Sequence, residues 1–209
     1  MKRLAIVLLL AAFVQSCGMV EVRETDTLTF NEHMRLGSIY EGQGKYELAL
    51  REYESAQVID TKEAQAYFAL GNVYLKVKDF PKAERNYQRA IELEPRPEFY
   101  NNMGWLLMEK GDLKGALKSV EEAVKMAAEG GYSYIYMDTL GVVQMRAGEM
   151  DKAEKSFLDA AGAVPPKGKD ALSEIYVHLS ELYKKTGRAE KAAVIDGKIR
   201  VLTAPGEGL

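Results

Sequence analysis

The sequence predicts an all-α solenoid, built from about five helix–turn–helix units stacked in a row. The main observation is an internal repeat, because five similar segments recur at intervals of 34, 33, 37 and 39 residues. They are HMRLGSIY (33–40), YFALGNVY (67–74), YNNMGWLL (100–107), MDTLGVVQ (137–144) and YVHLSELY (176–183). Apolar residues in these segments follow the period of a helix. Since such a unit cannot bury its apolar face alone, neighbouring units must stack to form a core.

Each unit carries small residues at two matched positions. The fifth position of each segment is glycine, or serine in the last, and an alanine follows twelve residues later. In chain order the pairs are Gly37 and Ala49, Gly71 and Ala83, Gly104 and Ala116, Gly141 and Ala153, and Ser180 and Ala192. Small side chains at both positions let the two helices of a unit approach each other closely. A further set of residues lies between the two helices, and it suits the left-handed position that ends a helix. These are Gly44, Lys78, Gly111, Gly148 and Gly187.

The first sixteen residues are predicted to be a targeting segment. Lys2 and Arg3 precede eleven apolar residues, 4–14. A run of this length is too short to span a membrane, but it suits the apolar core of a signal peptide.

The end of this segment, Val14-Gln15-Ser16-Cys17, resembles a bacterial lipobox. The resemblance implies cleavage before Cys17, lipidation of its thiol, and a place in the bacterial cell envelope, at the outer membrane facing the periplasm. Residues 17–29 would then be the lipidated N-terminus and a short tether. Gln15 stands where a small residue is usual. The alternative is an ordinary secreted protein that is cut near Ser16 or Gly18.

The remaining sequence resembles the tetratricopeptide repeat, a helix–turn–helix unit of about 34 residues. The resemblance implies a right-handed superhelix over residues 30–202. Its five units are expected at about 30–63, 64–96, 97–133, 134–172 and 173–202, and residues 203–209 are expected to be a flexible tail.

Composition and motifs argue against an enzyme. The net charge is −3, so the chain lacks the basic excess that drives binding to nucleic acid. A single cysteine allows no internal disulfide, and no metal-ligand cluster or catalytic set is visible. His33 falls at a packing position, and His178 lies four units away from it. We therefore expect no catalytic residue, cofactor, metal or small-molecule substrate.

The family resemblance also implies a concave groove, lined by the second, fifth, ninth and twelfth residues of each unit. In the second to fourth units the predicted groove residues are Phe68, Asn72, Leu75, Asn101, Trp105, Met108, Val142 and Met145. An exposed apolar stripe of this size is unusual without a partner, and tryptophan is enriched at binding hot spots. The alternative is that Trp105 packs internally against the next unit. Met34 and Ser38 stand where the family's carboxylate clamp has lysine and asparagine, so an apolar helix or extended strand is the expected partner.

The overall architecture resembles that of the type IV pilus biogenesis and stability lipoproteins. It implies a membrane-anchored scaffold for envelope complex assembly, with a secretin as a possible partner. The alternative is a periplasmic adaptor for peptidoglycan hydrolases or proteases.

The last helix has apolar residues with no following helix to cover them. They are Val194, Ile195, Ile199, Val201 and Leu202. They are expected to leave an apolar edge for a partner or a second copy.

Overall fold

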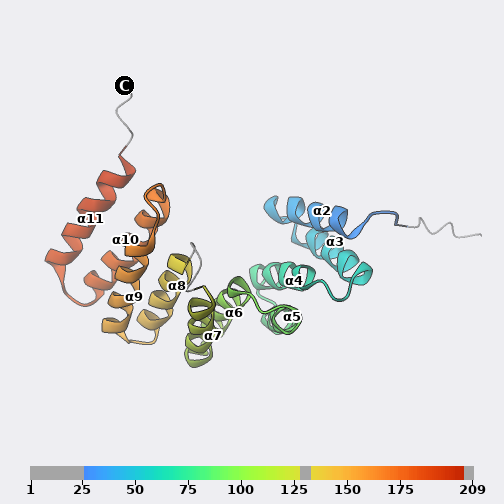
Figure 1. Cartoon of the computed structure of the whole chain (residues 1–209), viewed down its shortest axis with the longest axis horizontal. Coiled ribbons are helices and arrows are strands. Elements are labelled where there is room, and N and C mark those ends of the chain that lie inside the picture. The colour runs from blue at the N-terminus through green and yellow to red at the C-terminus, as the bar shows by residue number, and fades with distance from the viewer. Residues whose placement is uncertain (1–25, 128–132, 205–209) are drawn as a thin grey trace, which may run out of the picture.

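A computed structural model describes residues 26–127 and 133–204, which contain ten helices and no strand. The helices form five antiparallel pairs that follow one another along an open arch (Figure 1). This arrangement confirms the predicted all-α solenoid. The predicted signal peptide, Cys17 and most of the tether lie outside the described residues.

From the second pair on, the first helices face the hollow of the arch and the second helices lie on its outer side, while the first pair forms one tip of the arch (Figure 1). The first helices are α2 (Phe30–Gly42), α4 (Ala64–Lys76), α6 (Pro97–Glu109), α8 (Ser133–Arg146) and α10 (Lys169–Lys185). The second helices are α3 (Tyr46–Ile59), α5 (Phe80–Leu93), α7 (Leu113–Met126), α9 (Met150–Ala163) and α11 (Ala189–Thr203). None of the described helices has the length and apolar character that crossing a membrane requires.

In each of the first four pairs, a glycine of the first helix lies in close contact with a side chain of the second helix. A methyl group on Gly71 would lie only 2.5 Å from a ring carbon of Tyr87, and Gly141 meets Phe157 at the same distance. Gly37 and Gly104 have the same relation to Tyr53 and Val120. The alanines of the second helices are buried as predicted.

The two helices of the fifth pair contact each other through a hydrogen bond instead of a glycine. Its Ser180 hydroxyl donates a 2.5 Å hydrogen bond to the Asp196 carboxylate. Asp196 occupies the position of Tyr87 and Phe157 in the other pairs. A polar contact therefore replaces the packing of a glycine on a ring in the last unit.

The turns between paired helices have the predicted left-handed backbone. Gly44, Gly111, Gly148 and Gly187 all have positive φ, between 71° and 83°. Lys78 takes the same conformation, with φ of 62°, although it has a side chain. Local sequence thus ends each first helix at the expected place.

Charged contacts link the fourth and fifth pairs. The Glu154 carboxylate on α9 accepts hydrogen bonds from Tyr183, Arg188 and Lys191. Burial of Glu154 would raise its pKa, but these donors outweigh burial and lower the pKa to about 2. The carboxylate is therefore ionised over the physiological pH range.

The same two pairs are joined by His178 of α10, whose Nδ1 lies 2.9 Å from Oδ1 of Asp138 on α8. The hydrogen bond with Asp138 raises the pKa of His178, and burial only partly opposes it. This contact is therefore strongest when the imidazole is protonated.

We predict that this contact makes stability fall as pH rises. Its contribution should be complete below the usual histidine pKa of about 6.5 and lost as pH passes the raised value. Urea unfolding measured between about pH 5 and pH 8 should show this decrease in the wild type but not in His178→Gln. The two proteins differ only at residue 178, so the difference between their pH slopes reports on the His178–Asp138 contact. Identical pH slopes in the two proteins would contradict the assignment.

Candidate partner-binding groove

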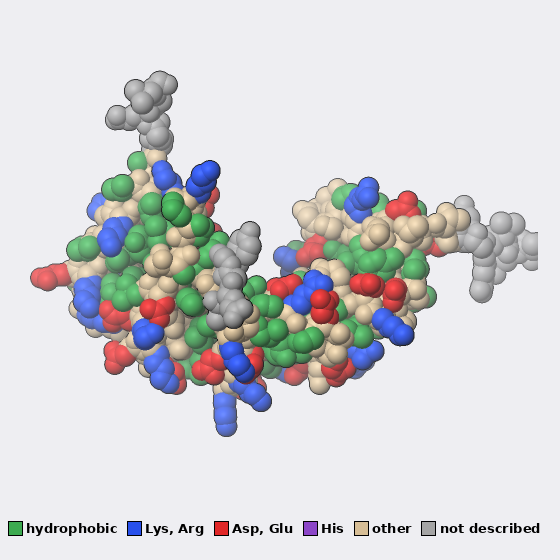
Figure 2. All heavy atoms as spheres, in the orientation of Figure 1, with side chains coloured by type: hydrophobic (Ala, Val, Ile, Leu, Met, Phe, Trp, Pro, Cys, Tyr) green, Lys and Arg blue, Asp and Glu red, His purple; other side chains and the backbone are tan. Residues whose placement is uncertain are grey.

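The inner side of the arch contains a pocket of about 360 Å³ that is lined by residues of α2, α4, α5 and α6. We call it the inner pocket; it is lined by Glu41, Asn72, Leu75, Lys76, Tyr87, Asn102 and Trp105. Figure 2 shows the hollow between the two arms of the arch, with apolar and charged side chains on its floor. The pocket combines two aromatic side chains, an aliphatic side chain, two amides and charges of both signs.

A hydrogen-bond network holds the polar side chains of this pocket in place. The Tyr87 hydroxyl and Nδ2 of Asn102 both donate to Oδ1 of Asn72, each at 2.8 Å. The Asn72 amide is thereby oriented by groups from α5 and α6. Its own Nδ2 donates no hydrogen bond within the described residues, so it is available to a carbonyl oxygen of a partner.

Glu41 and Lys76 give the inner pocket its charges. The Tyr53 hydroxyl donates to Oε2 of Glu41 at 2.9 Å, and this contact keeps the carboxylate beside the pocket. Lys76 is exposed. Burial raises the pKa of Tyr87 above its usual value, so the tyrosine stays a neutral hydrogen-bond donor.

Four predicted groove residues remain accessible. Asn72, Leu75 and Trp105 line the inner pocket and are half-buried. Phe68 is also half-buried, but its ring lies 4.5 Å from that of Phe99 and 5.9 Å from that of Tyr87. Phe68 therefore belongs to an aromatic cluster of the core more than to the surface.

The other four predicted groove residues do not line an accessible surface. Asn101, Met108, Val142 and Met145 are buried, with exposed fractions of 4 to 8%. The first helices α6 and α8 contact each other directly, and Met108, Val142 and Met145 belong to the core that they share. The expectation of one continuous exposed stripe through the fourth unit is therefore wrong.

Trp105 is both a groove residue and a packing residue, the two alternatives that the sequence left open. It packs against the shared core of the C-terminal pairs while it lines the inner pocket. A half-buried ring of this kind is held in one orientation and still offers contact area to a partner.

Sequence reasoning missed Glu41, Lys76, Tyr87 and Asn102, which also line the inner pocket. They lie outside the four unit positions that the family pattern selects. The cluster of asparagines in α4 and α6 was the available signal, because amides that project from adjacent first helices can meet. No group of three or more potential metal ligands occurs in the part of the chain that the structure covers.

Comparison with family models identifies the repeats. Residues 64–97 and 97–129 match models described as tetratricopeptide repeat, and residues 37–78 match one described as TPR repeat. The chain therefore contains tetratricopeptide repeats.

Curated relatives share only parts of their length with this chain. BBSome complex member BBS4 of Bos taurus is 28% identical over 110 residues, which are 53% of this chain and 21% of that protein. The chain spans about a quarter or less of the length of the curated relatives it matches.

Solved structures share the fold at low identity. BtubC of P. vanneervenii has a TM-score of 0.77 and 16% identity, over 86% of this chain and 81% of that chain. For PilF of Pseudomonas aeruginosa the TM-score is 0.70 and the identity 22%, over 86% and 77%. YrrB, described as a TPR protein with an unusual peptide-binding site, has a TM-score of 0.59 and 19% identity, over 84% and 87%. These similarities establish the solenoid fold.

The burial of Asn101 leads to a prediction about stability. Its Oδ1 is buried and has no hydrogen-bond partner, while its Nδ2 makes only a 3.4 Å contact with Asn102. Asn101→Leu should therefore raise the free energy of unfolding by about 1 kcal/mol, measured by urea titration. The control Asn31→Leu, at an exposed site of α2, should change it little. A loss of stability in Asn101→Leu would show that the amide makes a net stabilising contribution.

Proposed function

We propose that this tetratricopeptide-repeat chain is a non-enzymatic scaffold whose inner pocket binds a segment of a protein partner. The observation that carries the proposal is the inner pocket, where the oriented Asn72 amide lies beside the half-buried Trp105. Pockets that combine apolar contact area with a few positioned polar groups are typical binding sites.

The chemistry of the pocket suits an extended peptide or the end of a helix. Nδ2 of Asn72 can donate to a backbone carbonyl, and Trp105 with Leu75 can hold an apolar side chain. Glu41 and Lys76 can select for charge at the edges of that segment. The description of YrrB as a protein with a peptide-binding site supports this proposal, since the two chains share a fold.

We further propose that the scaffold is anchored through a lipidated Cys17 at the outer membrane and serves type IV pilus or secretin assembly. The lipobox-like residues 14–17 support this assignment. The fold shared with PilF of Pseudomonas aeruginosa is compatible with it.

The binding role can be tested in the source organism with a variant of the inner pocket. Deletion of the gene should reduce secretin multimers and pili, and the wild-type gene should restore both. Lys76→Glu should fail to restore them, because it reverses the charge of an exposed pocket residue without disturbing the core. The control Lys125→Glu, on the outer side of α7, should restore both fully, since its side chain is 76% exposed and outside the pocket. Unchanged multimers and pili after deletion would rule out the secretin role.

Direct binding can be followed through Trp105, the only tryptophan in the chain. Addition of a partner-derived peptide should shift its fluorescence, and Lys76→Glu should weaken that binding by about tenfold. A peptide that binds equally to the wild type and to Lys76→Glu would place the binding site elsewhere.

The anchor can be tested by Cys17→Ser. This variant should leave the membrane fraction and appear in the soluble periplasmic fraction, because the serine hydroxyl cannot take the place of the lipidated thiol. The Trp105 fluorescence of the folded chain should not change. A Cys17→Ser protein that stays in the membrane fraction would refute lipidation at this residue.

A further inference from the structure

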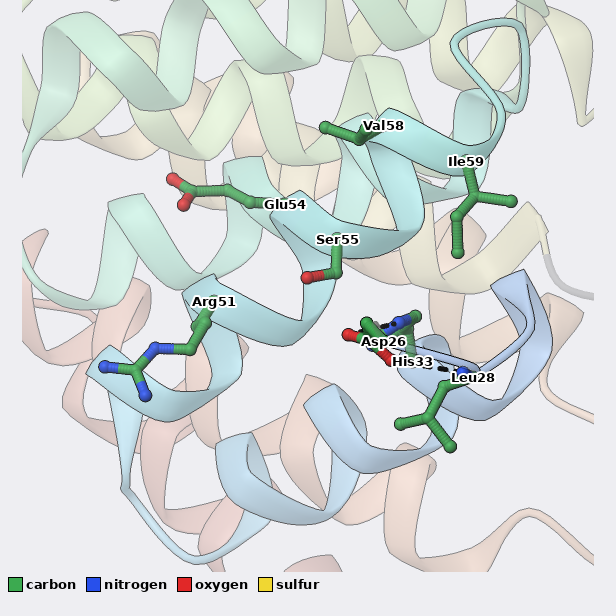
Figure 3. Close-up of a pocket in the computed structure, with 8 residues that line it drawn as sticks. All are labelled: Asp26, Leu28, His33, Arg51, Glu54, Ser55, Val58 and Ile59. Atoms are coloured by element: carbon green, nitrogen blue, oxygen red, sulfur yellow. Dashed lines mark hydrogen bonds and ion pairs between the residues drawn. The ribbon is translucent and has the colours of Figure 1, made fainter. Parts of the chain in front are cut away.

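The first helical pair carries an accessible apolar patch at the N-terminal end of the arch. We call it the N-terminal patch; Leu28, Val58 and Ile59 form its apolar part, and the same pocket is also lined by Asp26, His33, Arg51, Glu54 and Ser55 (Figure 3). It lies in a pocket of about 390 Å³. Val58 is 78% exposed and Ile59 51% exposed. Large aliphatic side chains are rarely left this open in a monomer when they lie side by side.

The last helical pair carries a similar patch at the other end. We call it the C-terminal patch; it lies between the start of α10 and the end of α11, and its members are Leu172, Tyr176, Lys198, Val201 and Leu202. The pocket measures about 410 Å³. Val201 is 78% exposed, and the Lys198 ammonium lies 5.3 Å from the centre of the Tyr176 ring.

The repeat register shows that these two patches are equivalent and unusual. Val58 and Val201 each stand nine residues after the alanine of their unit, where the second and third units have Glu92 and Lys125. In the second pair the matching pocket is lined by polar and charged side chains, among them Arg89 and Glu92. The second and third units thus present a charged side chain at this position and the fourth has Gly162, whereas the two terminal units present valine.

The two ends also differ in charge. Residues 26–63 carry eight acidic and four basic side chains, whereas residues 167–203 carry five acidic and eight basic ones. The pockets differ in the same direction, because two acidic side chains and one basic one, Asp26, Glu54 and Arg51, line the N-terminal pocket, whereas Lys198 is the charged side chain that lines the C-terminal pocket. The ends are therefore alike in apolar character and opposite in charge.

We propose that the N-terminal patch of one chain docks on the C-terminal patch of a second copy, head to tail. A chain cannot make this contact with itself, since α2 and α3 lie at one tip of the arch and α10 and α11 at the other (Figure 1). Pairing of two C-terminal patches would bring Lys198 of one copy toward Lys198 of the other, and opposite charges favour the head-to-tail arrangement. Such a contact leaves one free patch at each end, so association is open-ended. The proposal is independent of the proposed function, because neither patch shares a residue with the inner pocket.

Two blocking variants test the head-to-tail geometry. Light scattering of the full-length chain in detergent should give a mass that rises with chain concentration and falls with added salt. Val58→Asp and Val201→Asp should each weaken self-association by about tenfold or more. The control Leu158→Asp changes another exposed apolar residue, on α9, and should associate like the wild type. Because all three side chains are exposed, circular dichroism should show unchanged helicity.

A mixture of the two blocking variants gives the decisive result. The Val58→Asp chain keeps its C-terminal patch and the Val201→Asp chain keeps its N-terminal patch, so an equal mixture should form one-to-one dimers that grow no further. A Val58→Asp protein that still dimerises alone would show a symmetric contact and overturn the proposal. A wild-type chain that stays monomeric up to about 1 mM would also overturn it, and would leave the patches to a different protein.

Discussion

The close contact between a glycine of each first helix and a side chain of the second is the constraint on which the solenoid depends. In the first four pairs, Tyr53, Tyr87, Val120 or Phe157 occupies the space that a methyl group on the facing glycine would need. The contact brings the two helices of a pair together at a short distance, and it buries the small alanines between them. Four repetitions of one local geometry, with the Ser180–Asp196 hydrogen bond in the fifth pair, produce the arch.

In the second pair, this contact also positions a residue of the inner pocket, because Tyr87 belongs to both. Its ring packs on Gly71 in the core of the second pair, and its hydroxyl donates to the Asn72 amide at the pocket surface. Asn102 of the next pair donates to the same oxygen. The group that we propose for partner binding is therefore positioned by the packing within one pair and by the stacking of two. Such support keeps a polar side chain in one orientation before a partner arrives.

Features that depend on one unit could be predicted from sequence, and features that depend on how units meet could not. The repeat spacing predicted the solenoid, and glycine positions such as Gly111 predicted the left-handed turns, because both are local signals. Burial of Met108, Val142 and Met145 follows from direct contact between first helices of neighbouring pairs, which no single unit encodes. The last helix shows both cases, since Val194 and Val201 are exposed as expected whereas Ile195 is buried under α10 and the core.

A double-mutant cycle in the second pair tests the central constraint most directly. Gly71→Ala should lower the free energy of unfolding by about 2 kcal/mol in the wild type, because the added methyl meets the Tyr87 ring. In a Tyr87→Ala background the ring is gone, so Gly71→Ala should be neutral or stabilise by about 1 kcal/mol through its higher helix propensity. Gly197→Ala, inside α11, where an added methyl meets nothing within 4 Å, gives the reference for propensity alone. An equal cost of Gly71→Ala in both backgrounds would contradict the account.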